Sequence, residues 1–367
     1  MKCPYKCFTA AAIVYAAVCS SFMSTETAAA DSRGVECIHF GSFSAFDKSH
    51  DTNSGATMLT SPKMASHIHW NEMIVSWNII LPTNASMTVQ SKVFYPGYET
   101  QFYTMGRWST SPSQQPRESI PGQKDSDGEV LTDTLALKHP ANRFQLRITV
   151  SGEASVSAFK FLSVTLLDNR VTNDVLQPNH AAWGKTIPVP ERSQMVYEDG
   201  EKLCSPATVS MLLAFWGQTL NRPELDRSVP EIAKGVFDPN WPGMGNWSFN
   251  MAYAGSLPGM RAYVTRFTDV SELEDWIAAG IPVGISLCYN RLRRKSLEPS
   301  GHIVVCCGFS KNGDVIVNDP GTSQNVRKTF PRANLTDAWS YSRNTVYLIY
   351  PVNQKLPPDR FGHWASP

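Results

Sequence analysis

The stretch Leu203-Cys204-Ser205-Pro206-Ala207-Thr208-Val209-Ser210-Met211-Leu212-Leu213 places a thiol where a loop turns into an apolar helix. Pro206 suits the first helical turn, Ser205 can cap the helix, and Gly217 is a stop signal. The unpaired N–H groups and the positive dipole end of a helix favour a thiolate, so they lower the pKa of a thiol placed there. Taken alone, Cys204 is more readily explained as a buried structural cysteine or a disulfide partner.

A histidine and an acid stand on a predicted hairpin about a hundred residues later. Gly301-His302 opens an apolar strand, Asn312-Gly313 forms the turn, and the returning strand ends in Asn318-Asp319-Pro320. Asn-Gly between two β-branched runs is the strongest short-range signal for a hairpin. With this histidine present, the sequence favours a nucleophilic cysteine over a structural one.

The register of this hairpin decides which acid or amide faces the histidine. A four-residue loop between Phe309 and Asp314 would place Asp319 on the same sheet face as His302, within reach of a diagonal contact. A bulge in the turn would shift the register by one residue and bring Asn318 to that face instead. We therefore expect Asp319 as the partner of His302, with Asn318 as the alternative; a plain surface turn is the less favoured third reading.

Residues from about 186 to 350 resemble the papain-like cysteine peptidases of family thirty-nine, the bacteriocin-leader-processing type, and most closely its secreted bacterial relatives. The matching features are Val189-Pro190 with Ser193-Gln194, Cys204-Ser205-Pro206, the segment from Gly243 to Ala254, Gly301-His302, and Asn318-Asp319-Pro320.

This resemblance implies a role for each matched residue. Cys204 would be the nucleophile, His302 the base that later protonates the leaving amine, and Asp319 the orienting group. Gln194 would complete an oxyanion hole with the backbone N–H of Cys204. Ser205 stands where glycine often follows the cysteine in the family, which adds a Cβ beside that hole. The resemblance also implies an α+β papain-like domain without a cofactor.

The chain divides into five expected segments: a signal peptide at 1–30, a β-sandwich accessory domain at 31–170, a linker at 171–190, a papain-like peptidase domain at 191–353, and a C-terminal tail at 354–367. Lys2 and Lys6 precede a short apolar stretch, and Ala28-Ala29-Ala30 forms a small-residue cleavage site. The sequence thus predicts export to a periplasm or the medium, with no membrane span in the mature chain. A net charge of only +1 does not indicate a basic surface that would bind nucleic acid.

Cysteine usage agrees with a free catalytic thiol. Of the 8 cysteines, cleavage after Ala30 removes three and leaves an odd number, so at least one thiol stays unpaired. Cys306 and Cys307 lie inside one apolar strand and point to opposite faces, which favours core packing for both.

Residues 37–170 show compact or alternating apolar runs that predict an antiparallel sandwich. Several of its aromatic residues either fill the core, which we favour, or form a face for a glycan or peptide; they are Trp70, Trp77, Tyr95, Tyr98, Phe102, Tyr103 and Trp108. A metal site built from His39, His67 and His69 is not expected, because no carboxylate or cysteine stands at ligand spacing.

The sequence therefore predicts an exported cysteine peptidase that hydrolyses peptide or isopeptide bonds through a Cys-His-Asp triad and a thioester intermediate. Its partner would be a peptide or protein substrate, with cell-wall peptide as one class. The alternative is a catalytically inactive peptide- or glycan-binding surface protein on the same fold. A disulfide-bonded Cys204 or a distant His302 would favour that alternative.

Overall fold

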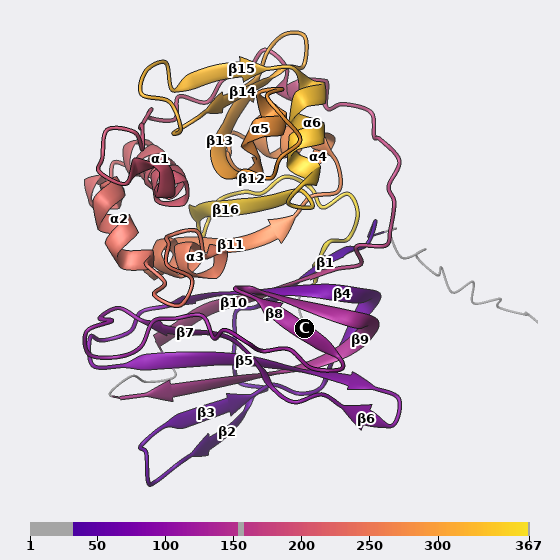
Figure 1. The fold of residues 1–367 in the computed structure, drawn as a ribbon, viewed down its shortest axis with the longest axis vertical. Coiled ribbons are helices and arrows are strands. Elements are labelled where there is room, and N and C mark those ends of the chain that lie inside the picture. Colours follow the sequence, from indigo (N-terminus) through magenta and orange to yellow (C-terminus); the bar gives the residue numbers. More distant parts are fainter. Residues whose placement is uncertain (1–31, 153–157, 366–367) are drawn as a thin grey trace, which may run out of the picture.

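The computed structural model describes residues 32–152 and 158–365. The predicted signal peptide, residues 1–30, lies outside the described residues. The described chain forms an all-β domain, drawn in indigo to magenta, on which an α+β domain in rose, orange and yellow is packed (Figure 1).

The first domain is built only from strands, as the sequence predicts. They are β1 (Val35–Phe40), β2 (Asp47–His50), β3 (Thr57–Thr60), β4 (Met64–Ile79), β5 (Ser86–Tyr95), β6 (Tyr98–Glu99), β7 (Tyr103–Ser109), β8 (Gly128–Leu131), β9 (Thr134–Ser151) and β10 (Phe159–Leu167). The all-β prediction is confirmed for the described part of this region.

These strands join one continuous curved sheet, a half-barrel, instead of two separate sandwich sheets. The main path runs β17-β1-β10-β4-β9-β3-β2, where β17 is Trp364–Ala365 near the end of the chain, and β5 and β8 also pair with β9. The long strands β4 and β9 cause this continuity, because their pairing is interrupted by register shifts near Trp70. Such irregularities bend a strand and let it pass from one layer to the next.

The second domain combines a six-stranded sheet with helices on its faces. Its strands follow the order β11 (Met260–Arg266), β16 (Thr345–Pro351), β12 (Val283–Cys288), β13 (Gly301–Phe309), β14 (Val315–Asn318) and β15 (Arg327–Phe330). Its helices are α1 (Cys204–Thr219), α2 (Val229–Val236), α3 (Trp247–Ser256), α4 (Val270–Ala278), α5 (Tyr289–Leu292) and α6 (Arg332–Ser340), with short 3-10 turns η2 (His180–Ala182), η3 (Gly200–Lys202) and η4 (Pro223–Leu225).

Helix α1 is the buried helix that the sequence predicts, with two differences in its ends. Its residues from Ser205 to Gly217 are all buried, as expected for a helix that is apolar on every side. Ser205 does not cap it, because the helix already begins at Cys204 and the Ser205 hydroxyl lies 2.9 Å from that of Tyr347. Gly217 does not end it either, since the helix continues to Thr219.

The two domains share one continuous core and a polar seam. The Asn78 side chain of β4 bonds to both the N–H and the carbonyl of Ala262 in β11, at 3.0 and 2.7 Å. Beside it, the Ser76 hydroxyl accepts from the N–H of Val264 at 3.0 Å. These bonds satisfy backbone groups that the junction removes from water, so they fix the position of β11 on the half-barrel.

The end of the chain returns to the first domain. Strand β17 (Trp364–Ala365) pairs in parallel with β1, opposite Cys37 and Ile38. No helix among the described residues is long and apolar enough to cross a membrane.

Candidate active site

Cys204 is the first residue of α1, and its sulfur is half-buried beside His302. Burial alone would raise the pKa of Cys204. The hydrogen bond and charge of His302, helped by the backbone N–H groups of Ile303 and Ser205, outweigh it and lower the pKa below the ordinary value of 9.0. The fold therefore favours the thiolate, the reactive form of cysteine.

His302 connects the thiol to a buried carboxylate. Its Nε2 lies 2.8 Å from Oδ1 of Asp319, which leaves Nδ1 for the sulfur of Cys204. Burial lowers the pKa of His302, but the bonds to Asp319 and Cys204 raise it to about 9. Burial raises the pKa of Asp319, and the bonds from His302 and Tyr289 outweigh this and lower it. The geometry thus suits a thiolate and imidazolium ion pair held by a carboxylate.

The register that brings Asp319 to His302 arises in a way that the sequence did not indicate. Phe309 pairs with Val315, one residue later than predicted, which by itself would favour Asn318. A bulge at Cys307, between Cys306 and Gly308, then shifts the pairing back by one residue. The two shifts cancel before the site is reached.

Asn318, the alternative partner, points away from His302. Its amide donates to the carbonyls of Val189 and Pro190, and its oxygen accepts from Arg327 at 3.0 Å. Asn318 therefore ties the segment before helix α1 to the hairpin.

Gln194 lies buried under the loop that leads into α1. Its Nε2 donates to the carbonyl of Gly200 at 2.7 Å, while its Oε1 is buried without a hydrogen-bond partner among the described residues. One amide hydrogen of Nε2 is therefore used by Gly200. Its role in an oxyanion hole stays a prediction.

Sequence reasoning missed Tyr289 and Gly321. The Tyr289 hydroxyl donates to Oδ2 of Asp319 at 2.7 Å, and its ring stacks on that of His302. A Cβ on Gly321 would lie 2.9 Å from the Tyr289 hydroxyl and 3.0 Å from a ring carbon of His302, so only glycine fits there. The glycine directly after Asn318-Asp319-Pro320 was the one available signal, whereas nothing in the sequence pointed to Tyr289.

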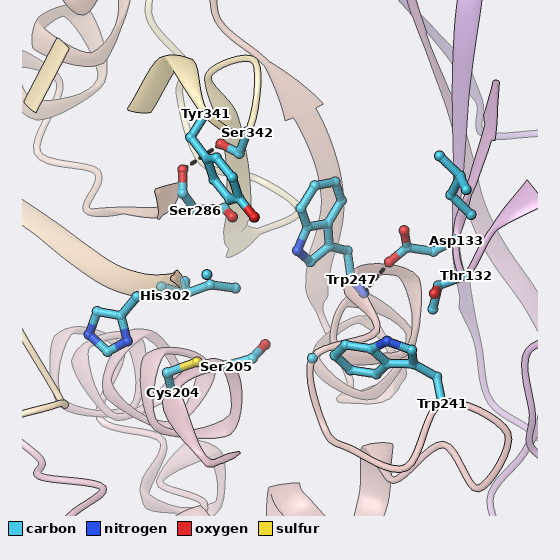
Figure 2. A pocket seen from close by; sticks show the side chains of 14 residues that line it. Thr132, Asp133, Cys204, Ser205, Trp241, Trp247, Ser286, His302, Tyr341 and Ser342 are labelled. Atoms are coloured by element: carbon cyan, nitrogen blue, oxygen red, sulfur yellow. Dashed lines mark hydrogen bonds between the residues drawn. The ribbon is translucent and has the colours of Figure 1, made fainter. Parts of the chain in front are cut away.

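A cavity of about 590 Å³ opens beside the sulfur of Cys204 (Figure 2). Its walls come from both domains: Leu131, Thr132, Asp133, Cys204, Ser205, Trp241, Gly245, Trp247, Ser286, Gly301, His302, Ile303, Tyr341 and Ser342. The segment from Gly243 to Ala254 lines it through Gly245 and Trp247, and the side chain of Asn246 caps helix α3 by accepting from the N–H of Phe249.

The other candidate residues of the first domain lie in the hydrophobic core or form isolated contacts. Trp70, Trp77, Tyr103 and Trp108 are buried, which confirms the core interpretation for these four. His39 packs against Phe161 and Tyr263, whereas His67 bonds to Glu36 at 2.9 Å. All five cysteines of the described chain are free, namely Cys37, Cys204, Cys288, Cys306 and Cys307.

Comparison with known families agrees with this architecture and defines a protein of a peptidase class. Residues 186–347 match the Peptidase C39 like family, and residues 22–163 match the Peptidase C39 N-terminal domain. These two matches confirm the resemblance to the C39 peptidases that the motifs predict. No curated protein and no solved structure matches it.

Proposed function

We propose that this protein is an exported cysteine peptidase that hydrolyses peptide or isopeptide bonds, with Cys204, His302 and Asp319 as its catalytic triad. The observation that carries the proposal is the hydrogen-bonded chain from the Cys204 sulfur through His302 to Asp319, at the mouth of a cavity. A nucleophile beside a base that a third group orients is the general signature of covalent catalysis.

The reaction follows from the protonation states that the site favours. The Cys204 thiolate attacks the carbonyl carbon, and the C=O electron pair moves to the oxygen of a tetrahedral intermediate. Protonated His302 then gives its proton to the leaving amine as the C–N bond breaks, which leaves a thioester on Cys204. Neutral His302 takes a proton from water, whose oxygen attacks the thioester and releases the acid and the thiolate.

The helix start would also stabilise the negative oxygen of the intermediate. Backbone N–H groups at the first turn of α1 point toward this region, and we propose the second amide hydrogen of Gln194 as a further donor. Loss of one such donor typically lowers the rate by about 10²–10³-fold.

The alternative of an inactive binding protein would need a disulfide-bonded Cys204 or a distant His302. Cys204 is not in a disulfide and is hydrogen-bonded to His302, which supports a catalytic role over the inactive alternative. Export to a periplasm or the medium, and cell-wall peptides as one substrate class, remain parts of the proposal. The same thioester would also serve acyl transfer if an amine replaced water.

Alkylation by iodoacetamide tests the activated thiol. Cys204 should react rapidly below pH 7, and His302→Ala should abolish this fast reaction, as read by peptide mass spectrometry. The buried Cys37, Cys306 and Cys307 give an internal reference in the same molecule. His50→Ala is the matched control, because His50 is an exposed histidine of β2.

The alkylation assay is paired with hydrolysis of dye-quenched casein by the mature chain. Cys204→Ala should remove the hydrolysis completely. Ordinary, slow alkylation of Cys204 in both the natural protein and His302→Ala would overturn the proposed function.

A further inference from the structure

The wall of the cavity opposite Cys204 belongs to the first domain. Leu131 pairs with Thr134 across the junction of β8 and β9, so Thr132 and Asp133 form a tight turn. Figure 2 shows this turn on the far side of the cavity from Cys204. The cavity is therefore incomplete without the half-barrel.

The turn is held in one position against the second domain. The buried carboxylate of Asp133 accepts a hydrogen bond of 2.6 Å from the N–H of Trp247, the first residue of α3. Thr132 has a φ of 61°, a left-handed conformation that is unfavourable for a β-branched residue. Strain of this kind persists where the surroundings enforce it, and it clusters at functional sites.

The first domain also fixes Trp241, which lines the cavity between the two domains. A Cβ on Gly245 would lie 2.8 Å from the Trp241 ring, so glycine lets the indole lie against its own loop. Asp238 closes this loop, and its carboxylate accepts from the N–H of Ser119 in the first domain at 3.1 Å and from Asn246 at 3.0 Å. The loop that carries Trp241 is thus anchored from both domains.

The exposed lining of the cavity is apolar. Leu131, Trp241 and Tyr341 are 55%, 46% and 43% exposed, and all three face this one space. Large side chains that remain exposed together mark binding sites more often than plain surface. Among the residues that the structure describes, no lysine or arginine lines the cavity, and the carboxylate of Asp133 is already bonded to the start of α3. These features favour a bulky apolar occupant over an acidic or a basic one.

We infer that the β8–β9 turn of the first domain is the specificity-determining wall of the substrate site. It would receive a large branched aliphatic or aromatic side chain of a peptide, close to the bond that Cys204 attacks. The leading domain would then be part of the peptidase's own substrate site. This inference rests on the proposed function, because the attack by Cys204 is what places that side chain in the cavity.

Peptidyl acyloxymethyl ketones test the inference independently of turnover, because they alkylate Cys204 while carrying a chosen side chain. The probes would carry phenylalanine, leucine, alanine, lysine or glutamate at each of the two positions nearest the ketone. Each rate is divided by the rate with iodoacetamide. For the full mature chain, phenylalanine or leucine at one position should react about tenfold faster than alanine, the scale of a hydrophobic pocket.

Leu131→Ala and Trp241→Ala should each remove most of this preference after each rate is divided by the same variant's rate with iodoacetamide. Leu297→Ala is the matched control, since Leu297 is 76% exposed and lies away from the cavity. Leu131→Lys is a second variant, chosen because Leu131 is exposed enough for a lysine to be compatible with folding. It should slow the reaction with the lysine probe.

The outcomes separate the two claims. A normal iodoacetamide rate with no side-chain preference, or a preference that Leu131→Ala leaves intact, would overturn this inference alone. A preference for the lysine probe would overturn it in favour of recognition by Asp133. Slow reaction with every probe and with iodoacetamide would overturn the proposed function, and this inference with it.

Discussion

The phenol ring of Tyr289 stacks on the imidazole of His302, with ring centroids 4.0 Å apart and an angle of 28° between the planes. The same tyrosine donates its hydroxyl hydrogen to Asp319 at 2.7 Å, and the Arg293 guanidinium covers its ring at 3.4 Å from the centroid. One side chain therefore restrains both the base and its carboxylate. Tyr289 is a positioning residue for the proposed triad.

Tyr289→Phe keeps the stacked ring and removes the bond to Oδ2 of Asp319. Because a buried acceptor is then unsatisfied, the free energy of unfolding should fall by about 1–3 kcal/mol. Loss of this bond raises the pKa of Asp319 and leaves more of the carboxylate's charge to His302, so the pKa of His302 should rise and the alkaline limb of hydrolysis should move to higher pH. The pH profile and urea unfolding measure the two effects.

The control for that variant is Tyr98→Phe, which removes an exposed hydroxyl bond to Asp127. It should leave both the pH profile and the stability close to those of the natural protein. An alkaline limb that does not move in Tyr289→Phe would contradict the positioning role, even if the stability falls.

Asp319→Asn and Asn318→Ala separate orientation of the histidine from support of the hairpin. Asp319→Asn should lower kcat by about 10²–10⁴-fold, because the amide cannot stabilise the imidazolium. Asn318→Ala removes the amide that donates to the carbonyls of Val189 and Pro190 and the oxygen that accepts from Arg327, so it should lower stability by about 1–3 kcal/mol and leave kcat within a few-fold. The reverse pattern in kinetics and unfolding would assign the orienting role to Asn318.

The pH dependence of hydrolysis follows from the directions of the two pKa shifts. The pKa of Cys204 is lowered from 9.0 and that of His302 is raised to about 9, so the ion pair exists between them. Hydrolysis should rise as Cys204 ionises and fall near pH 9 as His302 loses the proton that the leaving amine needs. Alkylation needs only the thiolate, so it should show the acid limb without the fall. A hydrolysis rate that stays level above pH 9 would contradict this assignment.

The parts of the site that came from the sequence are those encoded by short local signals. Cys204 at a helix start and His302 at the head of an Asn-Gly hairpin needed only neighbouring residues. Asp319 faces His302 because the longer turn and the bulge at Cys307 shift the strand register in opposite directions. No residue type in the sequence predicts that bulge.

Tyr289 and the cavity wall depend on contacts between distant segments. The strand before Tyr289 is joined to the His302 strand by the short helix α5 and an irregular loop, so the sequence pattern predicts no register between the two strands. Leu131 lines the same cavity as Cys204 because the half-barrel packs on the second domain, through hydrogen bonds such as that from Asn78 to the carbonyl of Ala262. Likewise, the curvature of the half-barrel follows from the interrupted pairing of β4 with β9, which strand patterning alone does not predict.

Glu72→Ala tests whether the two domains unfold together. Glu72 of β4 lies 2.5 Å from Arg266 of β11 and 2.7 Å from Arg343, and Arg266 is buried. Removing the carboxylate leaves a buried guanidinium unpaired, so stability should fall by about 3–5 kcal/mol in a single urea transition. Glu99→Ala breaks an exposed pair with Lys92 and should cost less than about 1 kcal/mol. Two separate transitions would show that the seam does not couple the domains.

Asp133→Asn tests the charge that the interdomain turn brings into the junction. Burial raises the pKa of Asp133 from 3.8 to about 6, so the folded protein binds this proton more tightly than the unfolded chain does. The resulting stabilisation is fully present below about pH 4 and is lost as the pH rises through 6. Asparagine keeps an oxygen for the N–H of Trp247 but does not ionise, so the natural protein should lose about 2–3 kcal/mol relative to the variant between pH 4 and pH 7. Urea unfolding at both pH values measures this change. An equal stability difference at both would mean that Asp133 titrates normally in the folded junction.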